Sequence, residues 1–424
     1  MNQIKIRRFK RLHEILLLSG PSSWLIGFAV VVLVPVLLLW GWGPLWSLDN
    51  GQRTALILVI VAFVACKLLI DKSQQGYPGA RSAWLIIPTV GVTYALIYTT
   101  SFVFRYDASR ALLLSSSFLA LAWFLLESVF TSRYRVLKLA IVPGGEAETL
   151  LDLPGLDGRL LKSYDLAGYR YDGVAADFSC IQPDAERFLT RCALDRVAVY
   201  NSRQVFESLT GRVKIDRMSE NTIGSLLPSR GYEIVKLIVD YAMVILSSVV
   251  VVPVCLLAML AIRLESPGKV IYSQQRIGLG NREFTIYKLR SMRFDQDCVV
   301  EQFAGEDDPR ITRVGKIIRK LRIDELPQFY NVLRGEMSLI GPRPEQPSFV
   351  REFDEKIPFY SYRHVVKPGI TGWAQVRQGY VANEDETRVK IEHDFYYIKH
   401  CSVMLDIYIV FLTVKTMLTG FGAR

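Results

Sequence analysis

Two adjacent carboxylates, Asp324 and Glu325, lie in the stretch of the chain whose residue types are best suited to chemistry. Pro327 suits the first turn of a helix and Gly335 suits the position after its end, so the pattern predicts a short helix with Asp324 at or near the N-cap. The free N–H groups and the dipole at a helix start stabilise an ionised carboxylate and can hold a phosphate beside it. The stretch therefore suggests a carboxylate nucleophile at a phosphate-binding surface, and a purely structural N-cap is the alternative.

Arginines gather around this pair, and the guanidinium fork matches the oxygens of a phosphate. Four lie within the same stretch: Arg319, Arg322, Arg334 and Arg343. Pro342 and Pro344 stiffen the backbone beside Arg343, which limits the entropy lost when it clamps an anion. Singly, each arginine would be an ordinary solvated side chain, but together with the carboxylates they predict a diphosphate-binding site.

Polar residues outside this stretch are candidates for the same site. They are Arg276, Lys288 and Arg290 upstream and Gln375 downstream. Gln375 follows a predicted turn at residues 369–372, and with Trp373 it could shape a pocket for a base or a sugar. A plain tight turn with a core tryptophan is an equal alternative.

Three long motifs give the sequence its resemblance to a known family. They read SPGKVIYSQQRIGLGNREFTIYKLRSM (residues 266–292), DPRITRVGKIIRKLRIDELPQFYNVLRGEMSLIGPRPE (308–345) and VKPGITGWAQV (366–376). Residues 266–416 resemble the catalytic domain of the bacterial sugar transferase family, the polyprenyl-phosphate phosphoglycosyltransferases that start exopolysaccharide, capsule and O-antigen assembly. The whole chain, with four apolar stretches before a soluble segment, resembles the large members of that family.

The resemblance implies a two-step transfer from a UDP-sugar to a polyprenyl phosphate. Asp324 would attack the phosphate bonded to the sugar and release UMP, forming a covalent phosphosugar-aspartate, and Glu325 would assist proton transfer from the acceptor. A Mg²⁺ ion, with Asp324 as its protein ligand, would offset the charge of the diphosphate. The residues expected to bind substrate are Arg276, Lys288, Arg290, Arg319, Arg343 and Gln375. The large members generally favour simple hexoses such as glucose or galactose, so a UDP-hexose is the expected donor.

Two alternatives to this reaction stay open. In a direct, single-displacement transferase, Asp324 and Glu325 serve only as metal ligands and no covalent intermediate forms. In a non-enzymatic scaffold for a polysaccharide assembly complex, the middle of the chain recruits partners and the carboxylates are dispensable.

The composition indicates a membrane protein. The chain has 424 residues, 50% of them hydrophobic, with a net charge of +10 and a mean hydropathy of +0.23. Because long apolar stretches accompany the positive charge, an anionic membrane face is the expected partner and nucleic acid is not. The six cysteines lack CxxC spacing and the four histidines lack metal-ligand spacing, so neither a disulfide framework nor a zinc site is expected.

Four apolar stretches are each close to the length of a membrane-crossing helix. They are residues 24–46, 54–70, 83–104 and 111–130. Basic residues lie before the first stretch and after the fourth, so both ends of the predicted four-helix transmembrane bundle, residues 1–135, should face the cytoplasm.

Residues 136–228 alternate short apolar segments with glycine, proline and charged residues, which predicts a small soluble α/β domain. Gly144 and Gly145 follow its first predicted strand. Without a full GxGxxG motif, a structural or regulatory role for this domain is favoured over nucleotide binding.

The stretch from residue 234 to 262 is apolar and long enough to span a membrane. A crossing here would place the carboxylate pair outside the cell, away from cytoplasmic nucleotide sugars. Pro253 interrupts helix hydrogen bonding, so we expect a broken, re-entrant helix within residues 229–265, as the resemblance also implies. A spanning helix with a tolerated proline is the alternative. Lys236 and Asp240 are spaced to pair near the start of the helix.

Residues 266–424 are predicted to form a compact, mostly helical catalytic domain in which His393 and Asp394 have packing or structural roles. The final apolar stretch, residues 403–418, contains Asp406 and is short for a span, so an interfacial helix is expected. The predicted fold class is a membrane α+β protein of the bacterial inner membrane, with the catalytic domain on the cytoplasmic face. Its expected partners are a UDP-sugar, a polyprenyl phosphate and membrane lipids, with a second copy of the chain as a further candidate.

Overall fold

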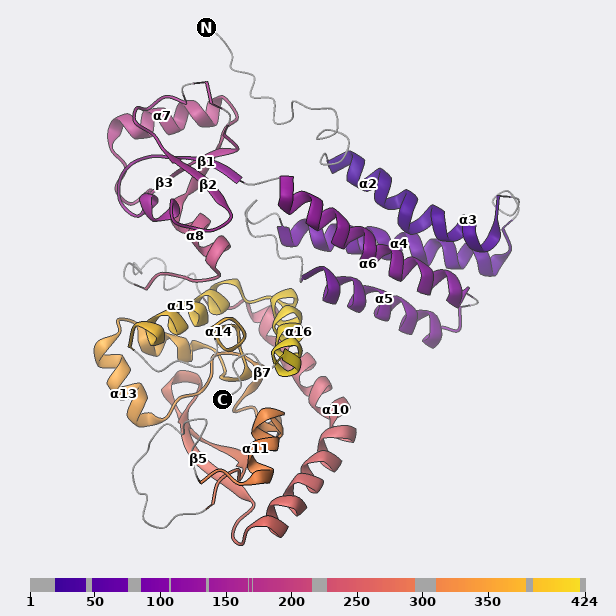
Figure 1. Cartoon of the computed structure of the whole chain (residues 1–424), viewed down its shortest axis with the longest axis vertical. Coiled ribbons are helices and arrows are strands. Elements are labelled where there is room, and N and C mark those ends of the chain that lie inside the picture. The colour runs from indigo at the N-terminus through magenta and orange to yellow at the C-terminus, as the bar shows by residue number, and fades with distance from the viewer. Residues whose placement is uncertain are drawn as a thin grey trace. The chain divides into compact units, whose positions relative to one another are not determined.

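The computed structural model describes residues 20–42, 48–74, 85–106, 108–134, 137–166, 168–169, 171–215, 227–293, 310–378 and 384–419. The chain divides into two compact units, Met1–Gly211 and Arg212–Arg424. Figure 1 shows long helices and a small sheet domain in the first unit, and a mixture of helices and short strands in the second.

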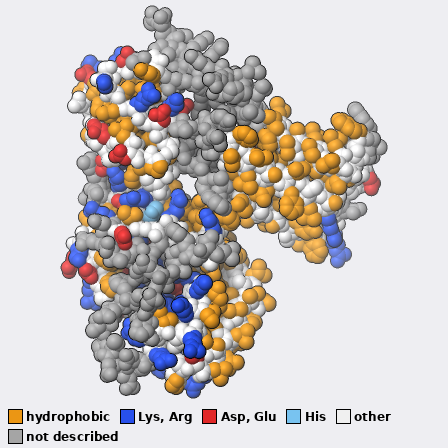
Figure 2. Space-filling view, viewed as in Figure 1, with side chains coloured by type: hydrophobic (Ala, Val, Ile, Leu, Met, Phe, Trp, Pro, Cys, Tyr) orange, Lys and Arg blue, Asp and Glu red, His pale blue; other side chains and the backbone are white. Residues whose placement is uncertain are grey.

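Long apolar helices form the first part of the first unit. In chain order they are α2 (Gly20–Phe28), the π-helical segment η1 (Ala29–Leu33), α3 (Val34–Trp40), α4 (Asn50–Gln74), α5 (Ile86–Val103) and α6 (Arg110–Tyr134). Helices thus occur at all four predicted spans, although positions 43–47 and 83–84 lie outside the described residues. Each has the length and hydropathy to cross a membrane. Their common core includes Val31, Phe63 and Phe124, and hydrophobic side chains also dominate their exposed surface (Figure 2).

A charged cluster lies inside this helical unit. Lys67 Nζ of α4 lies 2.9 Å from Glu127 Oε1 of α6 and donates a 2.7 Å hydrogen bond to Ser23 Oγ of α2. Asp71 Oδ1, one turn further along α4, lies 3.3 Å from the same nitrogen. Because Lys67 is buried, the carboxylates compensate a charge that would be costly in an apolar bundle. One ammonium group therefore joins three helices.

A parallel sheet forms where the sequence predicts a small α/β domain. Its strands are β1 (Leu137–Ile141), β2 (Leu156–Leu160), β3 (Gly173–Ala176) and β4 (Ala198–Asn201), in the order β2-β1-β3-β4. The helices that accompany them are α7 (Pro183–Leu194) and α8 (Ser202–Thr210). Phe188 of α7 packs with Val174, while Val205 of α8 packs with Ile141 in a separate core. Both faces of the sheet are therefore covered, as is usual for parallel strands.

A carboxylate fills the position next to the glycines that follow β1. Asp177, directly after β3, accepts hydrogen bonds from the N–H of Glu146 (2.9 Å) and from the N–H and hydroxyl of Ser179 (3.0 and 2.6 Å). A Cβ at Gly145 would lie 2.3 Å from Asp177 Oδ2. Burial by itself would raise the pKa of Asp177, but these donors lower it to about 2. The sheet edge at which doubly wound folds bind phosphates thus holds the chain's own carboxylate, which suits a structural role.

The second unit contains the stretch predicted to be the catalytic domain. Its elements in chain order are α10 (Arg230–Glu265), β5 (Ile271–Ile277), β6 (Glu283–Leu289), α11 (Arg313–Lys320), η7 (Ile323–Glu325), α12 (Gln328–Leu333), β7 (Ser338–Ile340), α13 (Pro347–Lys356), η8 (Tyr360–Val365), β8 (Gly369–Thr371), α14 (Trp373–Arg377), α15 (Glu384–His400) and α16 (Val403–Thr419). β5 and β6 form an antiparallel hairpin, and β7 pairs in parallel with β8. Helices dominate the described part of this unit, as predicted.

One helix covers the segment in which the sequence predicts a break. α10 extends over 36 residues as one helix that contains Pro253, so the chain does not leave the helix at the proline, and the predicted re-entrant kink at Pro253 stays a prediction. Figure 1 shows that the axis of α10 turns along its length. A proline removes one helix hydrogen bond and displaces the preceding turn, which bends a helix without necessarily ending it.

α10 packs on the rest of the second unit at two places, one in its first half and one near its C-terminal end. Val244 is buried in a core with Ile286 of β6, and Ile262 is buried in a core with Leu289 of the same strand. Between these two contacts the helix exposes apolar side chains, of which Val249 is 77% exposed. The helix is therefore held at two points and leaves an apolar surface between them.

Polar contacts fix the first half of α10. Tyr232 Oη donates a 2.8 Å hydrogen bond to Asp406 Oδ2 of α16, and Lys236 Nζ lies 3.2 Å from the same oxygen. Asp240 accepts a 2.6 Å hydrogen bond from Ser338 Oγ of β7. The charges of Lys236 and Asp240 interact, as predicted, and each side chain also meets a partner from a distant part of the sequence.

Replacing Lys67 with methionine should destabilise the helical unit by about 3–5 kcal/mol, because it leaves Glu127 in the bundle without its cation. We expect a lower midpoint of thermal unfolding for the purified protein in detergent. The double variant Lys67→Met/Glu127→Gln should recover part of the loss, since it removes both charges. Equal midpoints for Lys67→Met and the wild type would show that the cluster does not stabilise the bundle.

Candidate active site

The carboxylate pair lies in a 3₁₀ turn and not at a helix N-cap. Asp324 and Glu325 belong to η7, whereas α12 begins at Gln328 with Pro327 as its N-cap. The predicted short helix exists but starts later than expected, because proline occupies the cap position. Arg322, directly before η7, has a φ of 57°, a left-handed conformation that redirects the chain just ahead of the pair.

Glu325 is buried among positive charges. Its Oε1 accepts hydrogen bonds from Lys288 Nζ (2.9 Å) and Arg343 Nη2 (2.8 Å), and its Oε2 lies 3.8 Å from Arg322 Nη1. Burial by itself would raise the pKa of Glu325, but Arg343, Lys288 and Arg322 together lower it far below its ordinary value. Glu325 is therefore a fixed anion.

Asp324 has the opposite electrostatic character. Burial and the neighbouring charge of Glu325 raise the pKa of Asp324 to about 6, against the opposing effect of Lys288. Its Oδ1 is buried and accepts no hydrogen bond within the described part of the chain. Two neighbouring carboxylates whose pKa values are pushed apart have separate chemical capacities. Asp324 keeps an oxygen for a cation or an electrophile, while Glu325 is committed to its cations.

A tight corner carries Arg343 to the pair. β7 leads directly into residues 341–345, GPRPE, and β8 lies beside it. Gly341 N–H donates a 2.9 Å hydrogen bond to Thr371 O. A Cβ at Gly369 would lie 2.0 Å from Gly341 N, so glycine is required for the two segments to approach this closely.

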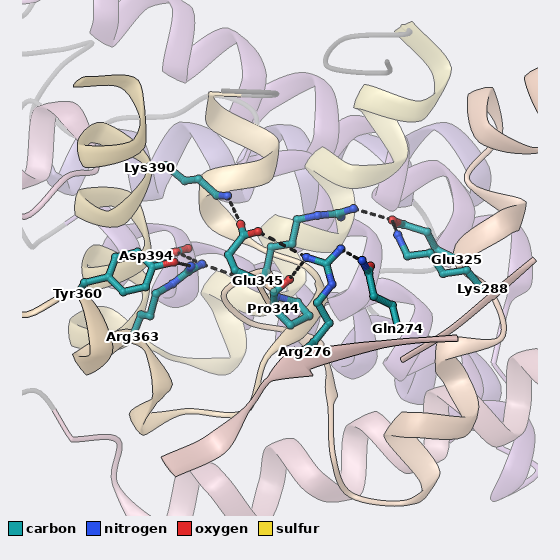
Figure 3. A network of polar contacts seen from close by, with 11 residues as sticks. Gln274, Arg276, Lys288, Glu325, Pro344, Glu345, Tyr360, Arg363, Lys390 and Asp394 are labelled. Atoms are coloured by element: carbon teal, nitrogen blue, oxygen red, sulfur yellow. Dashed lines mark hydrogen bonds and ion pairs between the residues drawn. The ribbon is translucent and has the colours of Figure 1, made fainter. Parts of the chain in front are cut away.

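Glu345 organises the other side of this corner (Figure 3). Glu345 accepts a hydrogen bond from Lys390 Nζ of α15, and its Oε2 lies 3.6 Å from Arg276 Nη1 of β5. Arg276 also donates to Pro344 O (3.2 Å) and to Gln274 Oε1 (2.8 Å). Burial by itself would raise the pKa of Glu345, but the surrounding cations, Lys390 foremost, lower it to about 2. Arg276 thus contacts Pro344 and Glu345, the two residues that follow Arg343 in the corner. Arg343 in turn contacts the carboxylate pair.

Three predicted substrate-binding residues do not contact the carboxylate pair. Arg290 donates to Ser266 O and Pro267 O, both at 2.8 Å, so its terminal nitrogens hold the turn after α10. Within the described ranges, Arg319 Nη1 and Gln375 Oε1 are buried without a hydrogen-bond partner, and neither side chain makes a hydrogen bond or ion pair with the carboxylates. Lys288 and Arg343 contact the pair, and substrate binding by the other three stays a prediction.

The surroundings of the site also contain residues that the sequence interpretation missed, namely Glu345, Lys390 and Arg363. Glu345 pairs with Lys390, and Arg363 pairs with Asp394, for which a structural role was expected. One signal was present: Lys390 and Asp394 are one helical turn apart, so they share a face of α15. Their partners lie in other elements and carry no local sequence signal.

A Mg²⁺ ion at this site would need ligands from outside the protein. Among the described residues, no group of three or more His, Cys, Asp or Glu side chains is arranged to hold a metal. Mg²⁺ is usually held by one or two carboxylates together with substrate phosphates and water. The unpaired Oδ1 of Asp324 fits that mode, whereas Glu325 Oε1 already accepts from two cations. The residues present therefore fit a Mg²⁺ ion that arrives with a diphosphate.

The raised pKa of Asp324 predicts that this residue destabilises the folded protein at neutral pH. The stability that it contributes is present below its ordinary pKa of 3.8 and is lost as the pH rises through about 6. At pH 8, Asp324→Asn should therefore increase the free energy of unfolding by about 1–3 kcal/mol and raise the midpoint of thermal unfolding. At pH 4 it should change the midpoint little. Asp184→Asn, whose side chain is 77% exposed, is the matched control and should show no pH-dependent gain. A lower midpoint for Asp324→Asn at pH 8 would contradict this account.

Comparison with known proteins finds relatives along the whole chain. Residues 231–420 match the family described as Bacterial sugar transferase. The chain is 47% identical over 420 residues to the UDP-N-acetylgalactosamine-undecaprenyl-phosphate N-acetylgalactosaminephosphotransferase of Aeromonas hydrophila, with 99% of each chain covered.

Two further relatives match part of the chain. The UDP-glucose:undecaprenyl-phosphate glucose-1-phosphate transferase of Escherichia coli K12 is 43% identical over 178 residues, which cover 41% of this chain and 38% of the relative. The protein of the same name from Caulobacter vibrioides is 42% identical over 202 residues, which cover 47% of this chain and 76% of the relative. The full-length similarity, with the family match over the second unit, shows that the chain is an enzyme of the bacterial sugar transferase family.

Proposed function

We propose that the chain transfers a sugar 1-phosphate from a UDP-sugar to a polyprenyl phosphate such as undecaprenyl phosphate, releasing UMP, as the first membrane step of polysaccharide assembly. The observation that carries the proposal is the carboxylate pair: Glu325 is fixed by Lys288 and Arg343, while Asp324 keeps an unpaired buried oxygen. The relatives support it, since their names give UDP-sugars as donors and undecaprenyl phosphate as the acceptor.

In the first step, a carboxylate oxygen of Asp324 attacks the phosphorus bonded to the sugar. A bond forms between this oxygen and the phosphorus, the bond to the bridging diphosphate oxygen breaks, and UMP leaves with the electron pair. A pKa of about 6 leaves most of Asp324 ionised at neutral pH, so no separate base is needed. Lys288 and Arg343, both paired to the adjacent Glu325, add positive charge beside the diphosphate.

In the second step, an oxygen of the acceptor phosphate attacks the same phosphorus and releases Asp324, giving a polyprenyl-diphospho-sugar. The sequence interpretation assigned proton transfer from the acceptor to Glu325, but a carboxylate whose pKa is far below neutral is a weak base. A phosphate monoester has a second pKa of about 6, so the acceptor is largely ionised already. We therefore assign Glu325 to holding Lys288 and Arg343 in place.

Bound Mg²⁺ would supply charge neutralisation for the diphosphate. Asp324 would hold the ion together with oxygens of the substrate, as its unpaired oxygen indicates. Arg276 lies within the same charged network through Glu345 and is placed to extend the phosphate-binding surface.

The contacts of α10 support a re-entrant arrangement in the bilayer. Val244 and Ile262 both pack with residues of β6. Eighteen helical residues rise about 27 Å, nearly the thickness of the hydrocarbon core, so a crossing helix would draw the catalytic unit into the bilayer. We therefore propose that α10 enters the cytoplasmic leaflet and returns, with the catalytic unit on the cytoplasmic face of the inner membrane. A lipid acceptor and a soluble donor can then meet at one surface.

Two nucleotide sugars are candidates for the donor. The resemblance favours a simple hexose, and partial relatives are named for UDP-glucose. The relative that matches 99% of the chain is named for UDP-N-acetylgalactosamine. UDP-N-acetylgalactosamine is therefore the first donor to test, with UDP-glucose beside it.

A single displacement is the alternative mechanism, because the unpaired oxygen of Asp324 would also suit a residue that serves only as a metal ligand. In a single displacement no sugar phosphate would become attached to the protein, and this difference from the two-step mechanism can be measured.

Asp324→Asn should reduce transfer by about three orders of magnitude or more, because an amide cannot act as the nucleophile. The assay follows labelled sugar passing from UDP-N-acetylgalactosamine or UDP-glucose to undecaprenyl phosphate in detergent. Asp184→Asn should keep wild-type activity. Wild-type turnover in Asp324→Asn would refute the assigned role, and a wild type that is inactive with both donors would refute the proposed pair of substrates.

Single cysteines introduced for Arg230 and Lys269, in a protein whose native cysteines are replaced, should both react with a membrane-impermeant maleimide from the cytoplasmic side. Arg230 is the first residue of α10, Lys269 follows its C-terminal end, and both are exposed. In right-side-out vesicles neither should react before detergent is added. Labelling of the two positions from opposite sides of the membrane would show that α10 crosses it.

A further inference from the structure

A fully buried ion pair lies behind the corner that carries Arg343. Arg363 Nη2 of η8 lies 2.6 Å from Asp394 Oδ2 of α15, and the two side chains are only 1% and 2% exposed. Figure 3 shows this pair on the side of the corner away from Glu325. A side chain so completely buried does not reach the diphosphate, so its action on the reaction must pass through the residues that it contacts.

The two terminal nitrogens of Arg363 make further hydrogen bonds, while its Nε is buried without a partner among the described residues. The same Nη2 donates a 2.9 Å hydrogen bond to the main-chain carbonyl oxygen of Arg343, and Nη1 donates a 2.9 Å hydrogen bond to Tyr360 Oη. A planar guanidinium directs its donors along fixed lines, so it can hold a carboxylate, a phenol and a carbonyl at the same time. A lysine ammonium in the same place would keep the charge and lose that geometry.

The contact with Arg343 connects the buried pair to the carboxylates. The backbone of Arg343 is held by Arg363, and its side chain donates to Glu325 Oε1 at 2.8 Å. Arg343 is also the leading cause of the lowered pKa of Glu325 after burial is set aside. A shift of the Arg343 backbone would therefore move the cation that Glu325 depends on most.

A second contact from the same helix supports this arrangement. Lys390, one turn before Asp394 on α15, pairs with Glu345, two residues after Arg343. α15 thus holds the corner by two routes. Asp394 acts through Arg363 on the backbone of Arg343, and Lys390 contacts Glu345 directly.

We propose that Arg363, held by Asp394, is a positioning residue that sets the backbone of Arg343 so that its guanidinium meets the carboxylate pair. The inference rests on the proposed function, because it gives Arg343 a role beside the diphosphate. A buried ion pair is weak evidence for stability alone, since well-packed apolar side chains often stabilise a protein as well or better. The direct bond to the Arg343 carbonyl is what gives this pair a role in the site.

The test compares Arg363→Lys with the wild type and with Arg351→Lys, a matched substitution at an exposed position of α13. Transfer from UDP-N-acetylgalactosamine and UDP-glucose to undecaprenyl phosphate is measured, and kcat and donor KM are determined separately. We expect Arg363→Lys to lower kcat by about 10- to 100-fold, with donor KM changed less than about threefold. Arg351→Lys should match the wild type. Asp394→Asn should lower kcat in the same direction, because it releases Arg363.

The kinetic parameters separate positioning from a general loss of structure. A partly unfolded variant loses kcat in proportion to its folded fraction, whereas a displaced Arg343 slows turnover by the folded protein. The kcat is therefore expressed per folded protein, and it should stay low in Arg363→Lys and equal the wild-type value in Arg351→Lys.

A structure determination that needs no turnover completes the test. In Arg363→Lys, Arg343 Nη2 should no longer lie within hydrogen-bond distance of Glu325 Oε1, whereas Arg351→Lys should keep this contact. Wild-type kcat in Arg363→Lys would overturn the inference. So would a loss of activity that only follows the folded fraction, with the contact between Arg343 and Glu325 unchanged. A wild type inactive with both donors, alongside loss of this contact in Arg363→Lys, would reject the proposed function and leave the positioning role supported.

Discussion

The arrangement of the second unit around the carboxylate pair depends on keeping the buried side chain of Glu325 ionised. Glu325 is 8% exposed, and an ionised side chain at that depth is tolerated only with close cations and good hydrogen bonds. Lys288 comes from β6, Arg322 from the turn before η7, and Arg343 from the corner after β7. Three segments far apart in sequence must therefore stay together. Burial and the charge of Glu325 together raise the pKa of Asp324, so the two neighbouring carboxylates differ in their chemical capacity.

The rest of the second unit makes this cluster rigid. Close approach of the strand pair at Gly341 and Gly369 fixes the path of the corner. α15 holds the corner from behind with Lys390 and, through Arg363, with Asp394. α10 is tied to the same framework by its contacts with β6 and by the hydrogen bonds that reach α16 and β7. The helix proposed to enter the membrane and the corner that carries Arg343 are thus parts of one packed unit.

The sequence was informative where the signal is local. Hydropathy located the helices of the first unit, and the spacing of charged residues in one stretch brought out Asp324, Glu325 and Arg343. It failed where the outcome depends on tertiary partners: the hydrogen bond from Lys236 to Asp406, 170 residues away, has no local signal. The start of α12 was also misjudged, because Pro327 occupies its N-cap. The support from Arg363 and Lys390 has no local pattern from which it could have been predicted.

The measurement that tests the central claim most directly is the intact mass of the purified protein after incubation with Mg²⁺ and either UDP-N-acetylgalactosamine or UDP-glucose, with no acceptor present. The account predicts an added mass equal to one sugar phosphate, which is absent in Asp324→Asn and disappears from the wild type when undecaprenyl phosphate is added. An unmodified mass with every donor, alongside normal transfer once the acceptor is supplied, would contradict the account and favour direct displacement.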